Sequence, residues 1–226
     1  MTAPFYVPPE QLVKDRAEFA RKGISRGRPI VVAQSADGIL LMGENASPSL
    51  RKIGEIYDKI AFAGVGRFNE FETLRVAGVR YADLKGYSYA RTDVTAKGLA
   101  NAYSQTLGQI FSHEVKPYEV DIVVAELGTT AADDQIFRVQ FDGTLRDAEG
   151  LAVLGAEEDA IADRLATAHD RAGSLGQAVH AVATAIEASA DAPIAADAWE
   201  AAVLDRAAPR RAFRRLSADE ISAARG

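Results

Sequence analysis

The chain has 226 residues, with 26 Lys and Arg against 32 Asp and Glu, which gives a net charge of -6 at pH 7. The length suffices for a substantial core, and the acidic balance argues against a general nucleic-acid binder. The absence of cysteine excludes disulfides, thiol catalysis and thiolate metal sites, and three scattered histidines (His113, His169 and His180) make no plausible zinc cluster. With no apolar run of ~20 residues and no signal peptide, we expect a soluble, cytoplasmic, single-domain protein with no metal and no cofactor.

The first predicted elements are an arm and a helix. Residues 1–8, MTAPFYVP, are short, apolar and rich in proline, so we expect a mobile arm there. A helix is predicted from Pro9 to about Lys22, because proline suits the first helical turn and Gly23 can end the helix. One face of this helix carries a stripe made of Leu12, Arg16, Ala20 and Ile24.

Two apolar strands at 30–35 and 39–43 form the predicted centre of the fold. Asp37-Gly38 between them provides the positive φ of a hairpin turn. Both strands are apolar at nearly every position, so each should be covered on both faces. In hydrolases that use their own N-terminal residue as nucleophile, such a strand begins with that residue. Here it begins with Ile30 after a leader of 29 residues, so the chain looks like a relative of these enzymes from which the nucleophile is missing.

The remaining elements alternate in groups. Further strands are predicted at 51–56, 59–65, 119–127, 135–142, 151–154, 199–204 and 212–216. Helices are predicted at 67–84, 95–113, 157–169 and 174–190, with a last one from Ser217, where Ser217 and Glu220 have the spacing of a capping box. Paired strands apolar on both faces, with helices arriving two at a time, indicate a four-layer αββα sandwich with an extra N-terminal helix.

A search for catalytic residues finds no complete set. Removal of Met1 would expose Thr2, but Thr2 lies 28 residues before Ile30, beyond a helix. Three serines have no histidine near them in sequence, although triads are assembled in space: Ser35, Ser47 and Ser49. Three carboxylates lie in or beside turns, where turn formation and solvation are the favoured roles: Asp37, Glu44 and Asp58.

Five blocks of sequence carry a family resemblance: RKGISRGRPIVV (21–32), ENASPSLRKIGEIYDKIAFAGVGRFNEFETLR (44–75), GYSYARTDVTAKGLANAYSQTLGQIF (86–111), KPYEV (116–120) and AVLDRAAPRRAFRRL (202–216). Together they resemble the α subunit of the actinobacterial 20S proteasome over nearly the whole chain. The chain departs from that pattern in a short loop at 129–135, in LGAEEDAI (154–161) and in a brief C-terminal tail. These differences affect surface detail.

The resemblance implies one α-type domain of the N-terminal-nucleophile hydrolase fold. Its parts would be a gating arm (1–8), an α-specific helix (9–23), a sandwich core (29–216) and a C-terminal helix or tail (217–226). Such a subunit is non-catalytic and forms the seven-membered outer ring on β subunits that hold the catalytic threonines. The implied substrates are unfolded proteins, including those tagged with prokaryotic ubiquitin-like protein, delivered by a hexameric ATPase.

The resemblance also assigns two local sites. The gating arm would comprise Thr2, Ala3, Pro4, Phe5, Tyr6, Val7 and Pro8, and an apolar strand end of this kind can pack weakly against its copies at a ring axis. Lys52 matches a lysine that receives the C-terminal carboxylate of an activator in a pocket between neighbouring α subunits, to which Gly64 and Val65 also belong. Without the resemblance, an ordinary disordered terminus and a solvated lysine beside Arg51 would be the simpler interpretations.

Two alternatives remain open from the residues. A self-contained amidohydrolase of the same fold would need Thr, Ser or Cys at the start of the core strand, where the chain has Arg28, Pro29 and Ile30. A nucleic-acid site would depend on the basic cluster near the C-terminus, for which salt bridging between subunits or rings is favoured. That cluster consists of Arg210, Arg211, Arg214 and Arg215.

Overall fold

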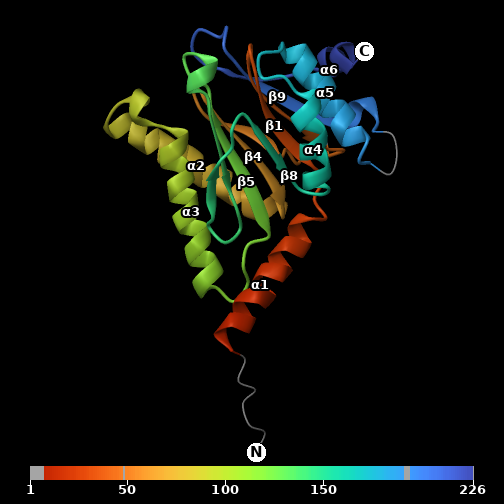
Figure 1. Cartoon of the computed structure of the whole chain (residues 1–226). Helices are drawn as coiled ribbons and strands as arrows, with labels where there is room; N and C mark the ends of the chain where they lie inside the picture. Colours follow the sequence, from red (N-terminus) through yellow and green to blue (C-terminus); the bar gives the residue numbers. More distant parts are fainter. Residues whose placement is uncertain (1–7, 48, 191–193, 226) are drawn as a thin grey trace, which may run out of the picture.

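A computed structural model describes residues 8–47, 49–190 and 194–225. Two antiparallel sheets lie face to face, with α2 and α3 over one outer face and α4 and α5 over the other (Figure 1). The predicted αββα sandwich is therefore confirmed. The helix α1 leads away from the sandwich at one end (Figure 1).

The first sheet contains the central hairpin and has the strand order β10-β9-β2-β1-β8. Its strands are β1 (Ile30–Ser35), β2 (Gly38–Glu44), β8 (Leu151–Leu154), β9 (Trp199–Asp205) and β10 (Phe213–Arg215). β1 and β2 join through a turn in which Gly38 has a φ of 147°. Every residue of β2 is buried, as are all but one of β1. The prediction that both faces of this hairpin are covered is confirmed.

The second sheet has the strand order β3-β4-β5-β6-β7. Its strands are β3 (Ile53–Tyr57), β4 (Ile60–Gly66), β5 (Val120–Glu126), β6 (Gln135–Val139) and β7 (Leu145–Asp147). The strand predicted at 135–142 was too long, because β6 ends at Val139 and a turn leads back into β7. In this turn Gly143 has a φ of 86°, and the Thr144 amide donates to Asp142 Oδ1 at 2.8 Å.

Six α-helices complete the described chain: α1 (Pro9–Ile24), α2 (Phe68–Ser88), α3 (Ala96–His113), α4 (Glu158–Ala168), α5 (Leu175–Glu187) and α6 (Ala218–Arg225). The capping box predicted before α6 is formed, since the Glu220 amide donates to Ser217 Oγ and the Ser217 amide donates to the Glu220 carboxylate. None of the described helices is long and apolar enough to cross a lipid bilayer.

The helix α1 is fixed to the sandwich mainly by its C-terminal half. Ala20 and Ile24 are buried, whereas Leu12, Val13 and Phe19 are about half exposed. Close to its end, a Cβ placed on Gly23 would lie 2.0 Å from a carboxylate oxygen of Glu119. Gly23 therefore permits the close approach of α1 to the residue that precedes β5, and the helix continues one residue beyond it.

Candidate functional site

Lys52 directly precedes β3, at the edge of the second sheet. Its carbonyl accepts a hydrogen bond from the Gly64 amide of β4 at 3.1 Å. Two of the predicted site residues, Lys52 and Gly64, are therefore neighbours in the sheet. A Cβ placed on Gly64 would lie 3.0 Å from Phe71, so this position faces α2 and leaves little space for a side chain.

Val65 has a different orientation. Its side chain is 1 % exposed and belongs to the core cluster between the two sheets. A Cβ on Gly27 would approach Val65 Cγ1 to 2.3 Å, so the segment after α1 packs directly on it. Val65 lies near the end of β4, paired with β5, and its side chain supports the site from inside the core.

The Lys52 ammonium reaches across to the first sheet. Its Nζ donates to the carbonyl oxygen of Arg28 at 3.3 Å and to that of Glu44 at 3.2 Å. Because an ammonium carries three donors, two are occupied by these carbonyls and one remains for a further acceptor. The side chains of Arg28 and Glu44 form an ion pair of 2.5 Å beside it.

The electrostatics of Lys52 are set by its position between the sheets. Burial lowers the pKa of Lys52 from 10.5 to about 8; the negative charges of Glu200 and Glu44 oppose this shift, and the positive charge of Arg28 adds to it. The group is therefore a protonated cation near neutral pH, held in a poorly solvated place where the attraction of an anion is stronger than in water.

Glu200 holds the backbone on which Lys52 is mounted. This carboxylate lies on β9 and is 3 % exposed. It accepts hydrogen bonds from the amides of Lys52 (3.0 Å) and Ile53 (3.3 Å). Asn45 Nδ2 at 2.6 Å and Arg215 Nη1 at 2.9 Å complete its contacts. The first sheet is thus hydrogen-bonded, through Glu200, to the beginning of β3.

The sequence patterns did not identify these supporting groups. Glu200 is separated from Lys52 by 148 positions, and the groups of Arg28 and Glu44 that contact the ammonium are backbone carbonyls, which carry no side-chain signature. Asn45 and Lys52 lie in the block at 44–75 and Arg215 lies in the block at 202–216, but nothing in the spacing of the two blocks indicates that they meet.

The predicted arm can be followed only at its last residue. Thr2, Ala3, Pro4, Phe5, Tyr6 and Val7 lie outside the described residues. Pro8 is extended, with a ψ of 141°, and precedes the first turn of α1. The arm therefore joins the sandwich through the helix that leads away from it (Figure 1).

Several of the residues considered for catalysis have structural contacts. At the start of β1, Ile30 is fully buried and has no nucleophilic atom. Ser35 donates from its hydroxyl to the Gly38 carbonyl at 2.9 Å, inside the central hairpin turn. Asp37 accepts a hydrogen bond from the Leu175 amide at the start of α5, and Asp58 forms an ion pair with Arg91. Within the described parts of the chain, no group of three His, Asp or Glu could hold a metal ion.

Three arginines of the C-terminal basic cluster contact carboxylates of their own chain. Arg211 donates to Glu55 at 2.8 Å, and Arg214 to Glu220 at 2.6 Å. Arg215 binds Glu200, as described above. Much of the positive charge of this cluster is therefore neutralised locally, which weakens the case for a nucleic-acid site.

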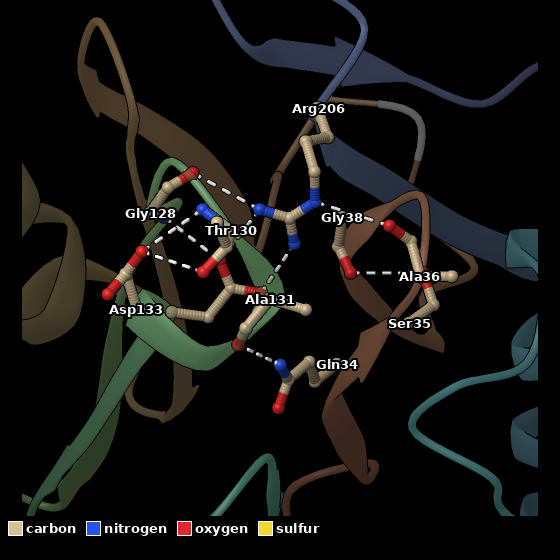
Figure 2. Close-up of polar contacts among 10 residues, drawn as sticks. Gln34, Ser35, Ala36, Gly38, Gly128, Thr130, Ala131, Asp133 and Arg206 are labelled. Carbon is tan, nitrogen blue, oxygen red and sulfur yellow. Dashed lines mark hydrogen bonds and ion pairs between the residues drawn. The ribbon is translucent and has the colours of Figure 1, made fainter.

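A cavity of about 1050 Å³ lies at the end of the sandwich opposite to Lys52. Figure 2 shows Arg206 at this end, between Ala36 of the central hairpin turn and Gly128 after β5. Arg206 also forms an ion pair of 2.7 Å with Asp134, whose side chain is 1 % exposed. A second cavity, of about 720 Å³, is lined in part by Arg28 and Glu44 and therefore adjoins Lys52.

Comparisons with known proteins agree with the fold and the sequence blocks. A family model described as "Proteasome subunit" matches residues 24–204. "Proteasome subunit alpha" of Thermomonospora curvata is 55% identical, over 98% of this chain and 96% of that protein. The protein of the same name from Kineococcus radiotolerans is 54% identical, over 96% of this chain and 95% of that protein. The one from Acidimicrobium ferrooxidans is 51% identical, over 100% of this chain and 97% of that protein. The chain therefore belongs to the proteasome subunit family, in which it resembles the α subunits of actinobacteria throughout its length.

Proposed function

We propose that this chain is the non-catalytic subunit of the outer ring of a proteasome core particle in the cytoplasm. Seven copies would form a ring on β subunits, which supply the catalytic threonines. Two observations support this role: the relatives are α subunits over nearly their full lengths, and the core strand begins with the buried Ile30 rather than a nucleophile. The substrates are unfolded proteins, including those tagged with prokaryotic ubiquitin-like protein.

The observation that carries the docking part of this proposal is the geometry of Lys52. Its ammonium is fixed by two backbone carbonyls and retains one donor. A compact cation of this kind suits a single terminal carboxylate. The ligand is the C-terminal carboxylate of a hexameric ATPase, and Gly64 and Val65, near the end of β4, adjoin Lys52.

The arm at residues 2–8 acts as the gate in this proposal. Its apolar residues Phe5, Tyr6 and Val7 pack against copies of themselves at the ring axis. So short a segment buries too little apolar area to keep the gate closed permanently, and docking of the ATPase can therefore open the gate. Docking of the ATPase and opening of the gate are therefore separate steps, which can be tested independently.

The test is peptide hydrolysis by particles assembled with the β subunit, with and without the ATPase. The Lys52→Ala chain is expected to assemble, and its particle should be stimulated by the ATPase at least tenfold less than the unchanged particle, because the cation that binds the carboxylate is gone. Lys59→Ala is the matched control, since this exposed lysine lies in the turn at the other end of the same hairpin. Retained stimulation in Lys52→Ala would refute the docking role.

Deletion of residues 2–8 separates the gate from the docking site. Without ATPase, the particle that lacks residues 2–8 is expected to hydrolyse peptides faster than the unchanged particle. Adding Lys52→Ala to the deletion should not slow this hydrolysis. If hydrolysis were unchanged by the deletion, the arm would not be the gate.

A further inference from the structure

Glu200 has more hydrogen-bond donors around it than a role in β9 alone requires. Oε1 accepts from the Ile53 amide and from Arg215 Nη1, and Oε2 accepts from the Lys52 amide and from Asn45 Nδ2. These four bonds use the full accepting capacity of a carboxylate. Arg215 Nη2 also donates to the Ile53 carbonyl at 2.7 Å, so both backbone groups of Ile53 are held.

This arrangement fixes the segment that carries Lys52. β3 is an edge strand of the second sheet, and a free strand end at this position would move relative to the first sheet. The carbonyls that orient the Lys52 ammonium lie at Arg28, just before β1, and at Glu44, the last residue of β2. Glu200 therefore joins the backbone of Lys52 to the first sheet, next to the carbonyls that its ammonium contacts, although it does not touch the ammonium.

A second buried carboxylate that binds an arginine lies at the opposite end of the sandwich. Asp134 accepts from Arg206 Nη2 at 2.7 Å and from the Gly128 amide at 2.9 Å. Arg206 in turn donates to the carbonyls of Gly128 and Ala36 (Figure 2). Both carboxylates link the two sheets, but only Glu200 contacts the backbone of Lys52, so Asp134 is a matched structural control.

We propose that Glu200 is a positioning residue for activator docking, which holds the backbone of Lys52 and Ile53 so that the Lys52 ammonium presents its remaining donor to a terminal carboxylate. This inference depends on the proposed docking role of Lys52. In this proposal Lys52 binds the carboxylate of the activator, and the buried Glu200 holds Lys52 in position.

The experiment uses the core particle assembled with its β subunit, carrying Glu200→Gln. The amide keeps the size of the carboxylate but replaces one acceptor oxygen with an NH₂ group, which faces two donors. The probe is a synthetic peptide that copies the C-terminus of the activating ATPase and has a free carboxylate; the same peptide as its C-terminal amide is the blank. The readout is stimulated hydrolysis relative to the basal rate of each variant.

For Glu200→Gln we expect the peptide concentration for half-maximal stimulation to rise at least tenfold. The negative charge of Glu200 raises the pKa of Lys52. As the pH is raised, stimulation of Glu200→Gln should therefore be lost at a lower pH than stimulation of the unchanged particle. Asp134→Asn should lower the thermal midpoint of the particle to a similar degree and keep the unchanged half-maximal concentration. Equal stimulation in Glu200→Gln and the unchanged particle would overturn the proposal, as would an equal loss in Asp134→Asn.

Lys52→Ala in the same assay separates failure of this inference from failure of the proposed function. Retained stimulation in Lys52→Ala removes the docking role itself, whereas loss in Lys52→Ala with full retention in Glu200→Gln removes only the role of Glu200. Should Glu200→Gln not assemble, Asn45→Ala removes one bond to the same carboxylate, together with the bonds of the Asn45 side chain to the Leu50 carbonyl and the Ser47 amide. We expect a roughly threefold rise in half-maximal concentration for that variant, and an unchanged value would overturn the proposal.

Discussion

At the scale of single residues, the chemistry of the proposed docking site depends on one partly desolvated cation. Burial lowers the pKa of Lys52 to about 8, so its charge titrates close to the pH of the cell. The sequence around Lys52 is compatible with a solvated lysine, and only the family resemblance indicated a binding role. Its two carbonyl partners lie at Arg28, before β1, and at Glu44, at the end of β2, and no local pattern places these groups beside it.

This pKa makes docking sensitive to pH. Between pH 6.5 and 7.5 Lys52 is protonated, and stimulation by a terminal carboxylate should be constant. Above the pKa of about 8, binding should weaken towards tenfold per pH unit, because only the protonated form pairs with the carboxylate. The measurement is the half-maximal peptide concentration as a function of pH, and the particle lacking residues 2–8 reports how the β subunits themselves respond. A constant half-maximal concentration up to pH 9.5 would contradict this assignment.

The same shift has the opposite consequence for folding. The pKa of Lys52 is lower in the folded chain, about 8 against 10.5, so the unfolded chain binds more protons between these values. The contribution of Lys52 to stability therefore rises with pH across that window. Loss of docking at high pH would thus not be caused by Lys52 destabilising the fold.

At the scale of secondary-structure elements, the sequence predicted the elements whose burial leaves a local pattern. The central hairpin was predicted because both strands are apolar at nearly every position, and β1 and β2 are buried accordingly. Phe137, Val139 and Phe141 alternate with polar residues and are all buried, but this alternation continues past the end of β6. The strand predicted at 135–142 was therefore too long, because the apolar alternation runs on into the turn-forming residues Asp142 and Gly143.

The contact between α2 and α3 gives a prediction at this scale. A Cβ on Gly78 of α2 would lie 1.7 Å from the Tyr103 hydroxyl, which donates to the Leu74 carbonyl at 3.0 Å. Gly78→Ala should therefore destabilise the chain by about 1–3 kcal/mol, although alanine favours helices. In a double-mutant cycle with Tyr103→Phe, we expect a coupling of at least about 0.5 kcal/mol, measured by urea unfolding.

A control for helix propensity is available in α5. A Cβ on Gly176 would have no contact closer than 3.9 Å, so Gly176→Ala should stabilise the chain by up to about 1 kcal/mol. If Gly78→Ala were as stable as the unchanged chain, or if its effect were independent of Tyr103, α2 and α3 would not be packed as described.

At the scale of the whole molecule, the order of strands and helices sufficed to predict the four layers. What could not be predicted is how the ends of the two sheets are joined. At one end Glu200 contacts Lys52 and Ile53, and at the other Arg206 contacts Asp134. Such contacts join segments far apart in sequence, and each is made by a charged residue that would be interpreted as exposed in isolation.

The central claim at this scale is that the chain is a ring-forming subunit without its own active site. The most direct measurement is native mass spectrometry of the C-terminally tagged chain, purified gently from its host, together with the intact mass of each component. The expected result is a particle of several hundred kilodaltons that contains this chain, with at most Met1 removed, and a second subunit whose N-terminal residue is threonine. A lone monomer or dimer with peptidase activity, or a chain cleaved near Ile30, would contradict it.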